Sequence, residues 1–148
     1  MKNLLLASLL LSASLLADFK VGDKLPPIEL SDQFDKKFKV KPSDKHIIMV
    51  FEKDVSMSVA EYLKTKPSDF LAQQQSKYIS DISAMPSLIT SMFALPKMKK
   101  YPFSVLLIND DFGKQFNRQE GKITLFKLQQ GKITSIEFIT AKELPKVF

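Results

Sequence analysis

Continuous runs of apolar residues along the chain predict which segments form buried strands. Two of these runs cover His46–Phe51 and Phe103–Ile108. A strand that is half exposed alternates apolar and polar residues, whereas a strand covered on both faces is apolar almost throughout. Both runs therefore predict buried strands of a sheet that is covered on both sides. A third segment, Tyr78–Ile82, predicts another strand between them.

Apolar residues at helical spacing fill the segment after the first strand. Val59, Tyr62 and Leu63 fall on one face of a helix. Ser56 or Ser58 is the expected N-cap, because a serine hydroxyl can accept a hydrogen bond from the first free amides of a helix.

Two further helical segments are predicted before the last buried strand. A short one covers residues 67–75, and a longer one covers residues 88–98, where Pro96 ends or kinks it. The apolar positions of the longer helix are Leu88, Ile89, Met92, Phe93 and Leu95.

Turn residues predict two hairpins. Residues Phe34–Val40 place apolar and polar residues around a turn, as in a short edge hairpin. Near the end of the chain, Gln129–Gly131 separates the strands Ile123–Leu128 and Lys132–Ile139. A short helix is expected from Ala141 onward.

The order of these segments predicts an α/β domain, a three-layer sandwich with a central mixed sheet and helices on both faces. Strands joined by helices favour right-handed crossovers, which restricts the topology to a few arrangements. We expect Phe51, Ile108 and Leu125 to lie on adjacent buried strands of this sheet.

The first 17 residues have the layout of a secretory signal peptide. Met1–Asn3 supplies a positive charge, Leu4–Leu16 is apolar, and Ala17 precedes the polar chain that begins at Asp18. A run of 13 residues is too short for a bilayer core, which needs about 20. We therefore expect cleavage near Ala17 and a mature, periplasmic domain over residues 18–148 with no membrane span.

Composition restricts the chemistry of this domain. The chain has no cysteine, so it can form no disulfide and carry no lipid anchor on a cysteine. Its net charge is +6, or +5 once Lys2 leaves with the leader. This excess suits an anionic envelope component as partner, or a solvated lysine-rich surface. Nucleic-acid binding is not expected, because the chain has no arginine cluster and no reader motif.

Three segments resemble parts of exported thioredoxin-like and peroxiredoxin-like proteins. They are the opening segment Val21–Pro26, the strand and acidic turn Tyr101–Asp110, and the closing strand-turn-strand Ile123–Ile133. With Lys99–Phe103 and the leader, they are most similar to the YtfJ family of small periplasmic proteins. The resemblance implies a thioredoxin-like fold and an exported protein, and it implies no activity.

The chain departs from the redox members of that superfamily where their chemistry takes place. Their first core strand runs into a Cys-x-x-Cys loop at a helix start, where a thiolate is stabilised. Ser56 and Val59 fall at the two cysteine positions here, in a loop that also contains Asp54. The redox members also have a proline before the neighbouring strand, where this chain has Lys122 before Ile123. Thiol-disulfide exchange and thiol peroxidase activity are excluded.

Other catalytic sets fit the sequence poorly. His46, the single histidine, and Ser56 lie beyond opposite ends of the first core strand, which separates them by more than about 15 Å. The acidic turn Asn109–Glu120 has Lys114 where a calcium loop requires glycine. Glu52–Asp54 suits either a polar site or a solvated helix start. We expect no cofactor and no metal site.

The last candidate is a surface over residues Met92–Phe103, which combines apolar and aromatic residues with Lys97, Lys99, Lys100 and Tyr101. It suits a partner or a membrane surface, because methionine adapts its shape and lysine can extend over apolar ground. The plainer interpretation is a helix whose apolar side packs on the sheet while its lysines face water, and we favour it.

Taken together, these patterns favour a noncatalytic binding or adaptor module. The alternative is an enzyme with non-thiol chemistry in the loop Lys53–Ser58. An open cleft lined by converging polar groups at that loop would favour the enzyme.

Overall fold

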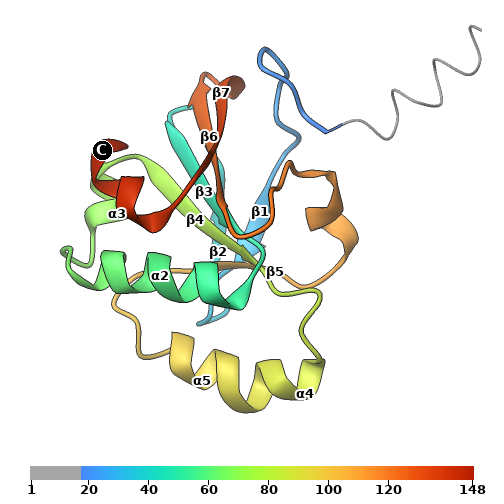
Figure 1. Cartoon of the computed structure of the whole chain (residues 1–148), viewed down its shortest axis with the longest axis vertical. Coiled ribbons are helices and arrows are strands. Elements are labelled where there is room, and N and C mark those ends of the chain that lie inside the picture. Colours follow the sequence, from blue (N-terminus) through green and yellow to red (C-terminus); the bar gives the residue numbers. More distant parts are fainter. Residues whose placement is uncertain (1–17) are drawn as a thin grey trace, which may run out of the picture.

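The computed structural model describes residues 18–148, which form a five-stranded mixed sheet surrounded by helices and a hairpin (Figure 1). The strand order is β5-β4-β3-β6-β7. The strands of this sheet are β3 His46–Val50, β4 Ser76–Asp81, β5 Leu106–Ile108, β6 Ile123–Gln129 and β7 Lys132–Ile139. The helical elements are α2 Lys53–Lys64, α3 Phe70–Gln73, α4 Ser87–Ile89, the π-helical turn η1 Thr90–Ala94, α5 Leu95–Met98, and the 3-10 helices η2 Asp111–Gln115 and η3 Ala141–Lys146. The leader predicted for residues 1–17 lies outside the described residues.

The sheet confirms the predicted α/β class. Strand β3 is central, parallel to β4 and antiparallel to β6. Its residues 47–50 are fully buried, as the apolar run predicted. The expectation that Phe51, Ile108 and Leu125 lie on adjacent strands is wrong. Strand β4 separates β3 from β5, and Phe51 follows β3 in a half-buried position.

Strand β5 is shorter than predicted, because a side chain takes over the backbone bonds of residues 103–105. The amide nitrogen of Gln33 donates to the carbonyl oxygens of Phe103 and Met98, at 2.8 and 3.1 Å. Its amide oxygen accepts from the Val105 N–H at 2.8 Å. Phe103 and Val105 are still buried. The predicted strand therefore keeps its burial and has a different hydrogen-bond partner.

The two faces of the sheet are covered differently. One face carries α2, α3 and η3, and Val59 and Leu63 of α2 pack with Ile48 and Val50 of β3. The opposite face carries η2 and the hairpin of β1 Glu29–Ser31 and β2 Lys37–Lys39. The hairpin predicted over residues 34–40 thus begins five residues earlier, at β1.

Helix α2 begins before either predicted cap. Its N-cap is Glu52, so Ser56 and Ser58 both lie inside the helix. Ser58 donates to the carbonyl oxygen of Asp54 at 3.1 Å, within the helix itself. The segment Lys53–Ser58, predicted as a loop, is therefore the first half of a helix. The polar residues of this segment suggested a turn, whereas the chain passes from β3 into α2 almost directly.

The closing hairpin has the predicted form. Strands β6 and β7 pair antiparallel and are joined by Gln130 and Gly131, which both have positive φ (52° and 77°). Two such residues form the type of turn that matches the twist of a two-residue hairpin. The short helix expected after Ala141 is η3.

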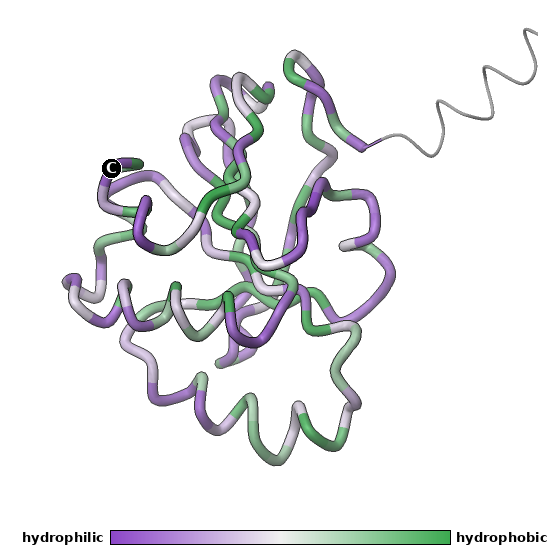
Figure 2. Tube along the Cα trace, in the orientation of Figure 1, coloured by the Kyte–Doolittle hydropathy of each residue, from purple (hydrophilic) through white to green (hydrophobic). Residues whose placement is uncertain are grey.

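The three consecutive elements α4, η1 and α5 form one helical segment, here called the 87–98 helix. The favoured interpretation, that its apolar side packs on the sheet, is wrong. Leu88, Ile89, Met92 and Phe93 are 42–64% exposed, and only Met98 in the last turn is buried. Figure 2 shows its hydrophobic first half and its more hydrophilic second half, away from the sheet. Phe103 and Val105, which follow the helix in sequence, pack instead in the core cluster with Val50 and Tyr78.

Candidate functional site

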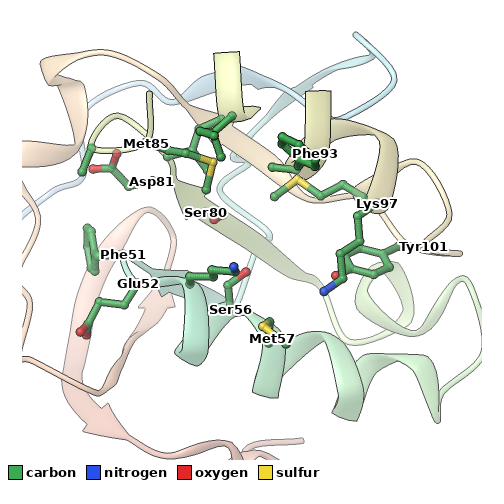
Figure 3. Close-up of a pocket in the computed structure, with 16 residues that line it drawn as sticks. Phe51, Glu52, Ser56, Met57, Ser80, Asp81, Met85, Phe93, Lys97 and Tyr101 are labelled. Atoms are coloured by element: carbon green, nitrogen blue, oxygen red, sulfur yellow. The ribbon is translucent and has the colours of Figure 1, made fainter. Parts of the chain in front are cut away.

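A cleft of about 410 Å³ separates the 87–98 helix from the start of α2, at the carboxyl ends of β3 and β4 (Figure 3). Its walls come from three parts of the chain that are distant in sequence: the start of α2, the end of β4 with the residues that follow, and the 87–98 helix. Its volume falls in the range typical of small-molecule sites, about 300–1,000 Å³.

One wall of the cleft is formed by the 87–98 helix and the residues on either side of it. The helix contributes Ile89, Phe93, Ala94, Lys97 and Met98, and Met85 and Tyr101 flank it. Ile89, Phe93 and Lys97 are four residues apart, so they lie on one side of the helix and form a stripe along the cleft. The stripe begins apolar and becomes cationic at Lys97.

The opposite wall is the first turn of α2, with Lys53, Ser56 and Met57. The Ser56 hydroxyl lies 3.0 Å from the hydroxyl of Tyr78, a fully buried residue of β4. Burial raises the pKa of Tyr78 far above its usual range, which outweighs the opposite effect of the Ser56 hydrogen bond. Tyr78 thus remains a neutral phenol near pH 7. It gives Ser56 no base that could activate it as a nucleophile.

The third wall ends in a polar cluster around Asp81. The carboxylate of Asp81 accepts from the Ser83 N–H at 2.9 Å and lies 3.8 Å from the Arg118 guanidinium. Arg118 also lies over the Phe51 ring at 3.9 Å and donates to the carbonyl oxygen of Gly113 at 2.8 Å. The carboxylate of Asp81 is therefore satisfied by other protein groups, although Asp81 lines the cleft.

Glu52, at the mouth of the cleft, is also engaged. Its carboxylate accepts from the Gly121 N–H at 2.6 Å, and in Figure 3 it points away from the cleft. This contact places the segment before β6 beside the start of α2. The segment contains no cis peptide bond and no proline.

His46 is remote from this site, as the sequence predicted. Its Nδ1 lies 3.1 Å from the hydroxyl of Ser76, at the amino ends of β3 and β4, whereas the cleft lies at their carboxyl ends. Partial burial lowers the pKa of His46, and the positive charge of Lys127 lowers it further. His46 and Ser56 therefore do not meet.

The described residues contain no other obvious chemical centre. Within residues 18–148, no three side chains of histidine, aspartate or glutamate gather as a metal site would require. No helix in that range combines the length and the hydropathy needed to cross a bilayer.

Comparison with known proteins gives a fold. No protein-family model matches the chain, and neither does any curated protein. Among solved structures, the thioredoxin domain of a thiol-disulfide oxidoreductase from Bacteroides vulgatus is 16% identical, with a TM-score of 0.57 over 88% of this chain and 96% of that one. The chain has a thioredoxin-like fold.

Two further structures agree. Peroxidoxin BcpB from Mycobacterium tuberculosis is 16% identical, with a TM-score of 0.57 over 87% of this chain and 93% of that one. A peroxiredoxin-like protein from Aquifex aeolicus is 9% identical, with a TM-score of 0.54 over 89% and 90%. At these identities the likeness concerns the fold alone. The present thioredoxin-like chain has no cysteine at any position.

The structure divides the residues singled out from the sequence. Lys97 and Tyr101 line the cleft, and so does Ser56. Lys99 and Lys100 are exposed but lie outside the cleft lining. Of the supposed redox loop, Asp54 is exposed in the first turn of α2 and Val59 is fully buried in the core.

Sequence reasoning missed Met57, Met85 and Ile89, and it included Phe93 only in a surface patch that it did not favour. The spacing of four from Ile89 through Phe93 to Lys97 is a signal present in the sequence. It supported a helix packed on the sheet equally well, because periodicity does not tell a buried face from one that lines a cleft.

Proposed function

We propose that this protein is an exported, noncatalytic binding module of the thioredoxin-like fold, and that its binding site is the cleft between α2 and the 87–98 helix. The exposed apolar stripe along that cleft carries the proposal. Soluble proteins rarely leave a contiguous row of large apolar side chains open to water unless a ligand or partner covers it. Ile89 and Phe93 are 42% and 63% exposed, and Met57 on the opposite wall is 42% exposed.

The polar groups of the cleft support binding over catalysis. Ser56 is paired with a neutral phenol, and the carboxylates of Glu52 and Asp81 are occupied by other protein groups. No nucleophile and base converge among the residues that line the cleft, which the enzyme alternative at Lys53–Ser58 would require. The absence of cysteine removes thiol chemistry as well.

The proposal also includes secretion of the protein and its membership of a protein family. The leader-like layout of residues 1–17 supports secretion to the periplasm. The opening segment Val21–Pro26 and the segment Lys99–Phe103 support membership of the YtfJ family. The partner would then be a protein or an anionic component of the envelope.

Site-specific crosslinking in intact cells tests the binding site. A photoreactive phenylalanine analogue at position 93 should give defined adducts after illumination. The same analogue at Phe34, which is 51% exposed on the β1–β2 hairpin, is the matched control and should give few adducts. Equal labelling from both positions would contradict the proposal.

Activity assays test the noncatalytic part. The purified protein should neither reduce insulin disulfides nor consume peroxide above a buffer blank. Activity that survives repurification and persists in a Ser56→Ala variant would show chemistry that the structure does not account for.

A further inference from the structure

The cleft wall formed by the 87–98 helix changes character along its length. Ile89 and Phe93 are apolar, and Lys97, four residues further on, places an ammonium group on the same stripe. Phe93 lies within the π-helical turn Thr90–Ala94, and such turns often occur at functional sites. In Figure 3 the Lys97 side chain extends from this helix toward α2, beside Tyr101. This wall of the cleft is therefore apolar at Ile89 and Phe93 and cationic at Lys97.

The charge on the 87–98 helix is of one sign. The carboxylates of Glu52 and Asp81 also line the cleft, but they accept hydrogen bonds from the Gly121 and Ser83 N–H groups. No acidic residue occurs between Asp81 and Asp110, so the whole 87–98 helix and its flanks carry only positive charge. Lys53 faces the cleft from α2 and Lys97 from the other wall. Within residues 18–148, neither lysine is among the six basic residues that form ion pairs. These two ammonium groups are complementary to an anion.

We propose that the cleft binds a single-chain anionic amphiphile, a fatty carboxylate, with its alkyl chain along Ile89, Phe93 and Met57 and its headgroup at Lys97 and Lys53. This inference rests on the proposed function and names its ligand class. A volume of about 410 Å³ suits one chain of a small ligand, and apolar walls with a few placed polar groups are typical of such sites. Methionine side chains adapt to a flexible chain, and Met57, Met85 and Met98 all line the cleft.

The shape of the site favours a bound molecule over the surface of a bilayer. Phe93 faces Met57 of α2 across a concave space (Figure 3), and Ile89, Ser80 and Asp81 also line it. A flat lipid surface would contact the part of the 87–98 helix outside the cleft, which carries the exposed Leu88 and Met92, and it would leave the groups inside the cleft unused. Binding to a membrane is therefore a competing outcome of the test.

Isothermal titration of the mature protein with monomeric decanoate at pH 8 tests the ligand class. Decanol and decyltrimethylammonium serve as neutral and cationic probes with the same chain. We expect decanoate to bind one to one, more tightly than either probe, and more weakly at 0.5 M than at 0.05 M salt because salt screens exposed charges. Equal affinity for decanoate and decanol would show that the lysines do not bind the headgroup. In that case, crosslinked adducts from the photoreactive residue at position 93 would still support the cleft as a binding site.

Variants locate the two ends of the ligand. Lys97→Gln should weaken decanoate binding about three- to fivefold and leave decanol binding unchanged, since the exposed ammonium group pairs with the carboxylate alone and such pairs are weak. Lys142→Gln, at an exposed lysine of η3, is the matched control and should change neither. Phe93→Glu should abolish the binding of decanoate and of decanol. Circular dichroism should confirm that the variant is folded.

Two results would overturn the proposal outright. One is decanoate binding that Phe93→Glu leaves intact in the folded variant. The other is binding to phosphatidylglycerol vesicles without any binding of monomeric decanoate, which would assign the exposed helix to a membrane surface.

Discussion

Single polar side chains fix the position of whole backbone segments in this protein. Gln33 is buried and forms three hydrogen bonds to the backbone of residues 98–105. Its neighbour Asp32 accepts from the Ser104 hydroxyl at 2.8 Å and from two backbone amides of its own turn. The β1–β2 hairpin thus holds the segment that connects the 87–98 helix to β5, and with it one wall of the cleft.

Gly113 shows how closely the polar end of the cleft is packed. A Cβ atom built at position 113 would overlap the carboxylate of Asp81, although the φ angle of Gly113 is not positive. Gly113→Ala should therefore destabilise the protein by about 1–3 kcal/mol, the usual cost of overpacking. Urea unfolding measures the effect.

A double variant provides the control for this prediction. In an Asp81→Ala background the clashing carboxylate is gone, so Gly113→Ala should cost clearly less than in the parent. Equal costs in both backgrounds would show that the carboxylate is not the obstacle.

The single histidine provides a direct electrostatic test. Because burial and the nearby Lys127 lower the pKa of His46 in the folded protein, its imidazole stays neutral where an unfolded chain would already bind a proton. The unfolded state therefore binds more protons as the pH falls below about 6.5, and stability decreases there. An NMR titration of the only imidazole should give a midpoint below that of the urea-unfolded chain. A midpoint at or above the unfolded value would contradict this placement.

At the scale of elements, two phenylalanine residues, one on β6 and one just after the neighbouring strand β3, differ in how deeply they are buried. Phe126 on β6 is fully buried, whereas Phe51 lies just beyond β3 and is half buried under Arg118. Phe126→Ala should cost about 3–5 kcal/mol and Phe51→Ala clearly less. The comparison of their urea midpoints checks this order, and equal losses would mean that Phe51 belongs to the core.

The 87–98 helix and the residues after it should divide into a surface part and a packed part. Lys97, Lys99 and Lys100 are exposed, so replacing all three with Gln should leave the urea midpoint nearly unchanged. Tyr101 is stacked on Phe103 with 5.0 Å between ring centroids and packs against the core below α2. Tyr101→Ala should therefore lower stability by about 1–3 kcal/mol. An unstable triple variant would show that the lysines have a structural role.

At the scale of the whole molecule, the leader and the folded domain should separate on export. We expect the protein recovered from the cell envelope to begin at Asp18, because Ala17 ends the leader-like segment. Intact-mass measurement of the recovered protein tests this expectation, and replacement of Ala17 with a bulky residue should slow the processing. Recovery of the uncleaved chain alone would contradict it.

The sequence by itself determined the class of fold and the chemistry that is ruled out. Strands covered on both faces are apolar over most of their length, so the unbroken apolar run Ile47–Val50 was enough to identify a buried strand. A two-residue turn with positive φ needs residues such as Gly131, which marked the closing hairpin. The absence of cysteine excludes thiol chemistry in any fold.

Only the tertiary structure decided where the binding site lies. Met57 and Phe93 are far apart in sequence, and the cleft between them exists because the 87–98 helix lies beside α2 instead of on the sheet. Periodicity identifies the residues that share a face of a helix, but the surroundings of that face depend on which other segments already cover the core. Here Phe103 and Val105, whose backbone is hydrogen-bonded to the remote Gln33, pack in the core, and the apolar stripe of the helix lines an open cleft.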